Sequence, residues 1–201
     1  MNVQTLVAAQ EHLSACDERM SELIGHHGSW RYKAGEPFDV LAYSIVGQQL
    51  SVRAAKTIRR RVLALTGNRK RFDANELVGV SRQQLRDAGL SRAKAKALAL
   101  LAESVVAGEL DFSSFASMAD DEVVKILCRH IGIGRWTAEM FLIFALGRPD
   151  VLSSGDLGLR RAAQAVYSLE ERPDAETFAE LGKHWRPYRS VASWYLWKVV
   201  D

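Results

Sequence analysis

The chain has 201 residues, of which 48% are hydrophobic and 25% charged, as in a globular protein long enough to bury a core. Four prolines and the lack of low-complexity tracts argue against long disordered linkers, and two cysteines are too few for a four-thiolate metal site. No apolar run is long enough to span a bilayer and no secretory leader is recognisable. We therefore expect a cytoplasmic protein, associated with the nucleoid if it is bacterial.

Apolar residues recur at helical spacing along nearly the whole chain, and no segment shows the alternation of a strand. The first predicted helix lies within residues 2–24. The next apolar stretch, residues 38–65, forms one helix or two. A break at residues 47–51 would make Ser51 the N-cap of the second of these helices.

Positive charge is concentrated in that region, although the net charge of the chain is only +3. No acidic residue occurs between Asp39 and Asp73, whereas acidic residues gather at 109–122 and 170–180. Such separation is typical of a protein with a polyanionic partner, but a solvated helix face explains the charge alone equally well. The basic residues are Arg53, Lys56, Arg59, Arg60, Arg61, Arg69, Lys70 and Arg71.

The remaining helices are shorter, and Ser81 and Ser91 are the expected N-caps of two of them. The segment GRPDVLSSGD, residues 147–156, is predicted to be a loop. The chain is therefore expected to fold as an all-α protein of about ten short helices. The remaining predicted helices cover residues 73–79, 81–88, 92–107, 120–129, 135–146, 156–168, 175–183 and 188–199.

The segment HIGIGRWTAEMF, residues 130–141, places a tight turn between two apolar helices. Gly132 and Gly134 permit positive φ and let another backbone or a phosphate come close. The amides of residues 132–136 open a helix, lack partners within it and can donate to an anion. A plain turn between packed helices explains a bare Gly-x-Gly about as well.

Four stretches of the chain together form a recognisable pattern: IVGQQLSVRAAKTI at 45–58, GLSRAKAKAL at 89–98, IGIGRWTAEMFLIFALGRPDVLSSGDLGLRRA at 131–162, and WRPYRSVASWYLWK at 185–198. In this order they resemble the helix-hairpin-helix superfamily of DNA base-excision glycosylases. Within this superfamily the chain resembles the 3-methyladenine DNA glycosylase II branch, which repairs alkylated DNA. The extra N-terminal β domain of its bacterial prototype is not expected here. His130-Ile131 replaces the frequent Leu-Pro before the glycines, which should alter hairpin packing only slightly.

The resemblance implies an all-α fold with two helical lobes, a helix-hairpin-helix motif and a DNA-binding cleft between the lobes. Residues 41–148 would form one lobe, which ends in the hairpin. Residues 1–40 and 149–201 would form the other, which carries the catalytic aspartate. The implied partner is double-stranded DNA with alkylated bases, and we expect a monomer that contacts no membrane.

The matched pattern assigns the catalytic carboxylate to Asp156, although an aspartate after a Ser-Ser-Gly loop is also a good helix N-cap. Trp136 stands where superfamily members that cut the DNA backbone place a nucleophilic lysine. This substitution implies a monofunctional glycosylase. An indole at this position can stack on a cationic, alkylated base, but a core tryptophan at a helix start is the simpler alternative.

The resemblance also implies a set of DNA contacts. Either Gln49 or Leu50 could be the wedge that fills the gap left by an extruded nucleotide, although a helix-ending turn explains each residue equally well. No cofactor is expected and no metal is required, but the hairpin carbonyls of Ile131 and Ile133 are candidates for a metal ion that helps to grip DNA. The expected DNA-binding residues are Gln48, Gln49, Leu50, Ser51, Gly132, Ile133, Gly134 and Arg135.

The leading hypothesis is a glycosylase that excises alkylated bases, such as 3-methyladenine and 7-methylguanine, from duplex DNA in base excision repair. The alternatives are a glycosylase of the same fold for another lesion and a non-catalytic DNA-binding protein with this hairpin. In the tail, Trp185, Arg186, Tyr188 and Arg189 are candidates for lining the cleft, although aromatic-rich terminal helices are more often core.

Overall fold

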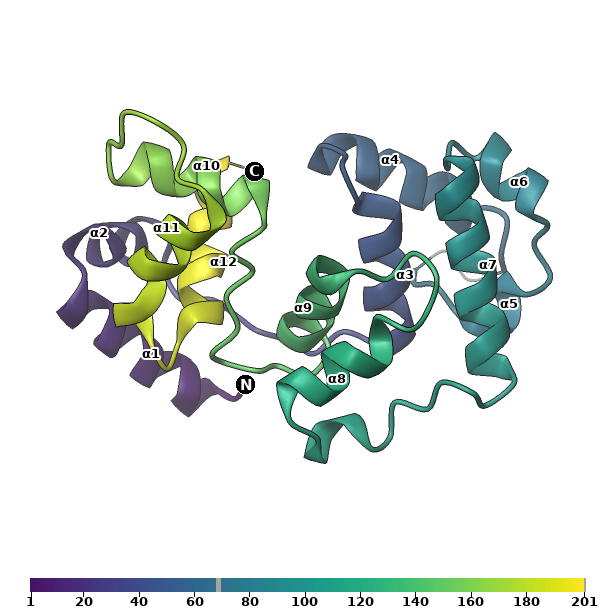
Figure 1. The fold of residues 1–201 in the computed structure, drawn as a ribbon, viewed down its shortest axis with the longest axis horizontal. Helices are drawn as coiled ribbons and strands as arrows, with labels where there is room; N and C mark the ends of the chain where they lie inside the picture. Colours follow the sequence, from purple (N-terminus) through teal and green to yellow (C-terminus); the bar gives the residue numbers. More distant parts are fainter. Residues whose placement is uncertain (68–69, 201) are drawn as a thin grey trace. The chain divides into compact units, whose positions relative to one another are not determined.

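The computed structural model describes residues 1–67 and 70–200, so Arg69 of the basic segment lies outside the described residues. The described residues form α-helices and two short 3₁₀ helices, without any strand (Figure 1). The predicted all-α fold is confirmed. The chain divides into two compact units, which we call the central unit, Gly35–Phe141, and the discontinuous unit, Met1–Ala34 with Leu142–Asp201.

The unit boundaries fall several residues before those expected at 40/41 and 148/149. The second boundary lies inside one helix, α9, Arg135–Phe144, because residues of that helix pack into different cores. Phe141 packs against Phe112 and Phe115 of the central unit, with ring centroids 5.6 and 5.8 Å away. Phe144 packs against Trp197 of the discontinuous unit, at 5.6 Å.

The central unit is organised around α3, whose apolar residues Leu41, Ile45 and Val46 are fully buried. Helix α3 packs against α4 and α7, and α7 also contacts α5 and α6. The helices of this unit are α3 (Pro37–Gly47), α4 (Val52–Leu63), α5 (Ala74–Leu77), α6 (Arg82–Asp87), α7 (Arg92–Val106), η1 (Phe115–Ser117), α8 (Asp120–Leu127) and the first part of α9.

Serine N-caps begin three of these helices, as the sequence predicts. The Ser51 hydroxyl accepts from the amide of Ala54, and that of Ser91 accepts from the amide of Lys94, both at 3.3 Å. Ser81 forms a reciprocal capping box with Gln84. Each cap satisfies an amide that the helix itself leaves without a partner. Residues 38–65 therefore form two helices separated by an exposed turn.

The discontinuous unit joins the early and late parts of the chain around α12, which packs against α10, α2 and α1. In Figure 1 the purple α1 and α2 and the yellow α12 belong to this same unit. Its helices are α1 (Val3–Cys16), α2 (Glu18–His27), α10 (Leu157–Val166), α11 (Ala175–Leu181), η2 (Gly182–Trp185) and α12 (Arg189–Val200), together with the end of α9.

Asp17 breaks the first predicted helix, residues 2–24, into α1 and α2. Its backbone is extended, and its Oδ1 accepts from the amides of Arg19 and Met20, which caps α2. The apolar spacing continues across this break, so periodicity alone predicted one helix where the structure has two. The expected number of about ten helices is exceeded for the same reason.

The second oxygen of Asp17 gathers residues from the late part of the chain. Oδ2 accepts from the Tyr167 hydroxyl at 2.6 Å, from the Trp185 indole at 2.8 Å and from His184 Nε2 at 3.1 Å. Burial raises the pKa of Asp17, but these hydrogen bonds more than offset that effect, so its pKa lies below its usual value. Asp17 thereby ties the two chain segments of the discontinuous unit together.

Candidate active site and DNA-binding segments

The hairpin between α8 and α9 requires glycine at only one of its two glycine positions. Gly132 has φ +83°, and a Cβ built there would collide with the Cβ of Ala97 on α7. Gly134 does not adopt positive φ, and a Cβ there would meet nothing within 4 Å. The packing of the central unit therefore explains Gly132 but gives no reason for Gly134.

The hairpin exposes its backbone and one apolar side chain. Ile131 is 55% exposed, whereas the Ile133 side chain is only 4% exposed and belongs to the core. The Ile133 amide donates to the carbonyl of His130 at 3.1 Å, so this amide closes the turn. The sequence places the Ile133 amide among those that can donate to an anion, and this hydrogen bond removes it from that set. The amides at the start of α9 stay the candidates for binding an anion. A metal ion on the carbonyls of Ile131 and Ile133 likewise stays a prediction.

Arg135 opens α9 and directs most of its side chain outward. Its Nε donates to Glu139 Oε1 at 2.9 Å, one helical turn further on. The Arg135 side chain is 73% exposed, while that of Glu139 is buried. The buried carboxylate thus fixes one edge of the guanidinium and leaves the rest exposed, as a phosphate contact requires.

The turn between α3 and α4 presents the two wedge candidates. Gln49 has φ 55°, a left-handed conformation that is uncommon for a residue with a side chain. Both Gln49 and Leu50 are exposed, and the amide of Leu50 donates to the carbonyl of Gly47 at 3.1 Å. Ser51 ends the turn as the cap of α4.

Gln48 links this turn to the hairpin. Its Nε2 donates to the Gly132 carbonyl at 2.9 Å and to Thr137 Oγ1 at 3.0 Å. The structure therefore brings the predicted residues 48–51 together with the predicted residues 132–135. Both of these acceptors are protein atoms, so Gln48 supports the neighbouring residues in addition to any contact of its own with DNA.

Sequence reasoning missed Lys94, which binds the backbone of the same turn and of the end of α3. Its Nζ donates to the carbonyl of Val46 at 2.9 Å and to the carbonyl of Gln48. Burial lowers the pKa of Lys94. The partners are backbone carbonyls 46 and 48 residues away, and no spacing in the sequence signals such a contact.

The basic segment is less uniform than its sequence indicates. Arg53, Lys56 and Arg60 of α4 are exposed. Arg59 instead pairs with Asp39 at 3.0 Å, with its guanidinium 5.2 Å from the ring centroid of Tyr43. Arg59 thus has a structural role in the central unit, and the exposed cations of α4 are those suited to a polyanion.

Asp156 lies in the discontinuous unit at the N-terminus of α10 and is only 8% exposed. Its Oδ1 accepts from the amide of Leu159 at 2.7 Å, so the predicted capping role is confirmed. The same oxygen accepts from the indole nitrogen of Trp197 on α12 at 3.3 Å. Gly158 lies beside this pair: a Cβ there would be 3.1 Å from Asp156 Oδ1 and 3.7 Å from Trp197.

Trp197 is the second residue that sequence reasoning missed, although it lies within the matched stretch WRPYRSVASWYLWK. The other tail candidates make contacts within the discontinuous unit, and their place in a cleft stays a prediction. Trp185 is fully buried and bonded to Asp17, and Arg189 pairs with Asp150 at 2.6 Å. Trp136, the base-stacking candidate, is half-buried in the first turn of α9, in the central unit.

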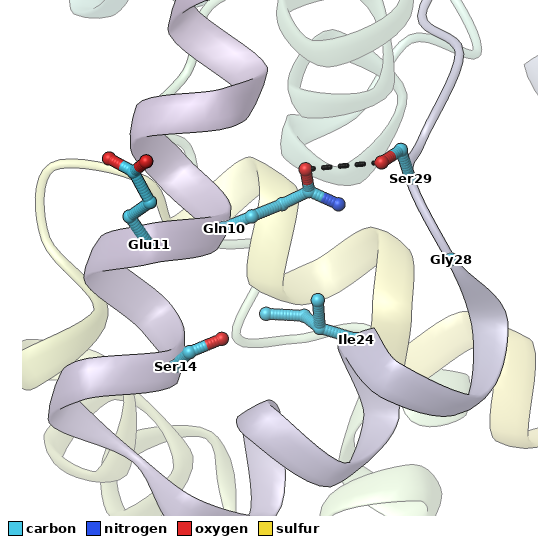
Figure 2. Close-up of a pocket in the computed structure, with 6 residues that line it drawn as sticks. All are labelled: Gln10, Glu11, Ser14, Ile24, Gly28 and Ser29. Carbon is cyan, nitrogen blue, oxygen red and sulfur yellow. Dashed lines mark hydrogen bonds between the residues drawn. The ribbon is translucent and has the colours of Figure 1, made fainter.

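An open pocket in the discontinuous unit lies between α1 and α2 and involves none of the expected site residues. Figure 2 shows that Gln10 extends across it, with its Oε1 accepting from the Ser29 hydroxyl at 3.3 Å. The Gln10 amide nitrogen donates to the Tyr195 hydroxyl at 2.7 Å. The lining residues are Gln10, Glu11, Ser14, Ile24, Gly28 and Ser29.

Within residues 1–67 and 70–200, no three side chains of His, Cys, Asp or Glu come together as metal ligands. In the same part of the chain, every helix is too short or too polar to cross a membrane.

These features define a helix-hairpin-helix protein, with an exposed glycine turn linked to a second exposed turn and a carboxylate that caps a later helix. Residues 42–187 match the model of the HhH-GPD superfamily of base excision DNA repair proteins, and the chain belongs to this family.

Two relatives are similar over most of the chain. DNA-3-methyladenine glycosylase 1 of Schizosaccharomyces pombe is 31% identical over 202 residues, which cover 98% of this chain and 89% of the relative. The putative DNA-3-methyladenine glycosylase YfjP of Bacillus subtilis is 33% identical, over 84% of this chain and 63% of the relative.

Solved structures agree with this relationship. The S. pombe 3-methyladenine DNA glycosylase in complex with abasic DNA matches with a TM-score of 0.87 and 30% identity, over 95% of both chains. A DNA-3-methyladenine glycosidase of Bacillus halodurans matches with a TM-score of 0.75 and 39% identity, over 96% of this chain and 89% of that one. The resemblance to the 3-methyladenine glycosylase branch is thereby confirmed.

Proposed function

We propose that this chain is a monofunctional DNA glycosylase that excises alkylated bases, such as 3-methyladenine and 7-methylguanine, from duplex DNA. The observation that carries the proposal is the placement of Asp156. A buried carboxylate oxygen accepts from the α10 amide of Leu159 and from the indole of Trp197, at the sequence position of the family's catalytic aspartate. The names of the relatives support the choice of substrate.

Asp156 acts on the sugar of the damaged nucleotide. Breaking the N-glycosidic bond passes through a cationic, oxocarbenium-like deoxyribose, and a fixed carboxylate stabilises this charge. The carboxylate also orients and deprotonates the water that attacks the sugar. The base leaves with the electron pair of the broken bond. Alkylation at a purine ring nitrogen already makes it a good leaving group, so the mechanism does not need a strong general acid.

Trp136 recognises the base by stacking. A cationic, alkylated purine is attracted to the face of an indole more strongly than a neutral purine is. Since position 136 carries no amine, the enzyme forms no Schiff base with the sugar. The product is therefore an abasic site in an intact DNA strand.

The protein binds DNA as a monomer, and its central unit makes the contacts with the DNA backbone. Exposed backbone around Gly134, the guanidinium of Arg135 and the cations of α4 contact phosphates, which hold the duplex without reading its sequence. The target nucleotide rotates out of the stack at a cost of a few kcal/mol. Gln49 or Leu50 fills the space that the nucleotide leaves.

The test is to incubate the protein with methylated genomic DNA and to identify the released bases by chromatography. Release of 3-methyladenine and 7-methylguanine is the expected result. Excision restricted to oxidised guanine in defined duplexes would assign the chain to another lesion. Binding without any release would assign it to non-catalytic recognition. Borohydride treatment during the reaction should trap no covalent protein–DNA adduct, and an adduct would contradict monofunctional chemistry.

A further inference from the structure

We propose that Gln48 and Lys94 are positioning residues that fix the exposed turn of residues 48–51 against the hairpin before DNA arrives. Through this turn they promote extrusion of the damaged nucleotide. The proposal rests on the proposed function, because it assigns the two residues to one step of that reaction. We call the contacts of these two residues the turn lock.

The first contact of the turn lock is made by the Gln48 side chain. Its amide nitrogen bridges the Gly132 carbonyl and the Thr137 hydroxyl, at 2.9 and 3.0 Å. Thr137 is itself buried in the first turn of α9. One side chain therefore spans from the turn to both the hairpin and the helix that follows it.

The second contact is made by Lys94 from α7. Its ammonium group donates to the carbonyls of Val46 and Gln48, at the end of α3. The carbonyls that end a helix lack intrahelical partners, and the negative end of the helix dipole attracts a cation. Lys94 thus binds the backbone of the residue whose side chain reaches the hairpin.

The third contact closes the arrangement through α7. Ala97 lies one helical turn after Lys94 and packs directly against Gly132, where no side chain would fit. The turn contacts the hairpin through Gln48, the hairpin contacts α7 through Gly132, and α7 contacts the turn through Lys94. Because the three contacts form a closed cycle, a movement of the turn, the hairpin or α7 breaks a contact with one of the other two.

The conformation of Gln49 shows what this cycle maintains. A residue other than glycine is strained in the left-handed conformation, and it persists there where the surrounding structure holds it. Gln49 has φ 55° and directly follows Gln48. The carbonyl of Gln48 accepts from Lys94, and its side chain donates to the carbonyl of Gly132. A wedge held in advance spends less binding energy on ordering itself, so more remains to offset extrusion of the nucleotide.

Removing a contact of the turn lock should impair extrusion of the damaged nucleotide. The variants are Gln48→Met and Lys94→Met, which keep side-chain length but remove the donors, and the milder Thr137→Val. The matched control is Gln83→Met, which removes an exposed hydrogen bond from the Gln83 amide group to Asp87 in the same unit. Thermal melting by circular dichroism establishes that each variant is folded.

The first measurement requires no excision. A duplex with 2-aminopurine beside an uncleavable abasic analogue reports unstacking by fluorescence when the turn inserts. At saturating protein, Gln48→Met and Lys94→Met should lose at least half of the wild-type increase, Thr137→Val should lose less, and the control should lose none. Unchanged fluorescence in folded Gln48→Met and Lys94→Met would overturn the turn lock, even if excision is established.

The second measurement compares two substrates in single-turnover reactions. For 7-methylguanine opposite cytosine, Gln48→Met should slow excision about tenfold or more. For the same lesion opposite an abasic analogue, where less pairing is lost, the deficit should shrink to about threefold or less. Equal deficits on both substrates would contradict a role in extrusion. If the wild type excises 7-methylguanine from neither duplex but the variants lose fluorescence, the turn lock stands and the proposed function fails.

Discussion

The indole nitrogen of Trp197 donates to Oδ1 of Asp156 at 3.3 Å, and the same oxygen accepts from the amide of Leu159 at 2.7 Å. Both donors belong to the discontinuous unit, so the carboxylate is oriented without any contribution from DNA.

Replacing Trp197 with Phe should slow excision about tenfold while leaving the affinity for abasic DNA nearly unchanged. The substitution keeps the aromatic contact with Phe144 but removes the donor, and a hydrogen bond to a charged group contributes about 1.5–3 kcal/mol. Single-turnover rates and equilibrium binding separate the two effects. The control is Trp194→Phe on the same helix, because the stacking of Trp194 on Trp30 survives the change. A Trp197→Phe enzyme with the wild-type rate would remove Trp197 from the mechanism.

Asp156→Asn should reduce excision by at least about 100-fold and should retain DNA binding. Asparagine caps a helix about as well as aspartate does, so α10 should remain folded. Asp174 provides a matched control, since it caps α11 by accepting from the amide of Thr177 at the same 2.7 Å. If Asp156 were only a cap, Asp156→Asn and Asp174→Asn would both excise bases at the wild-type rate.

Gly132→Ala and Gly134→Ala should have opposite consequences. Alanine at 132 would need positive φ and would collide with Ala97, so the central unit should lose about 1–3 kcal/mol of stability. Alanine at 134 meets no protein atom, so stability should change by less than about 0.5 kcal/mol. If a phosphate approaches Gly134, this second variant should bind DNA several-fold more weakly at fixed salt. Thermal melting and binding titrations measure the two effects, and unchanged binding by Gly134→Ala would contradict the phosphate contact.

Asp17→Asn should destabilise the discontinuous unit at neutral pH and reduce its sensitivity to acid. The folded pKa of Asp17 is lowered, because hydrogen bonds from Tyr167, Trp185 and His184 more than offset the effect of burial. Its stabilisation is therefore complete above the unfolded pKa, near 3.9, and is lost as pH falls through the lower folded pKa. Because the asparagine amide places a donor opposite these donors, the substitution should lower the free energy of unfolding of this unit by about 1–3 kcal/mol. Melting curves from pH 2 to 7 measure both effects, with Asp73→Asn, at another helix cap, as the control. A variant with the wild-type acid profile would exclude Asp17 as a source of this dependence.

Local chemistry made much of the fold predictable from the sequence. Ser51, Ser81 and Ser91 cap their helices because each hydroxyl reaches an amide three residues later, a distance that the sequence encodes directly. The hairpin was found in the same way, through two glycines and the helix that follows them. Gly134 was assigned the conformational role of Gly132 because the sequence does not show which glycine packs against α7.

Contacts between distant residues account for what the sequence missed. Trp197 lies 41 residues after Asp156, and Lys94 binds carbonyls that every residue type carries. The break at Asp17 could have been suspected from an aspartate before Glu18, a common start of a helix, but the apolar spacing concealed it. In each case the helix was predictable and the partner was not, because partners are selected by tertiary packing.

The division of the chain has a consequence for its synthesis on the ribosome. The central unit is continuous, so it can complete its core as soon as Phe141 has left the exit tunnel. Leu13 and Met20, however, are buried in a unit whose last helix begins only at Arg189. The hydrogen bond between Asp17 and Trp185 likewise cannot form until 168 further residues have been translated. A nascent chain that stalls before α12 therefore displays its first two helices to chaperones and proteases, with the inserted unit already folded.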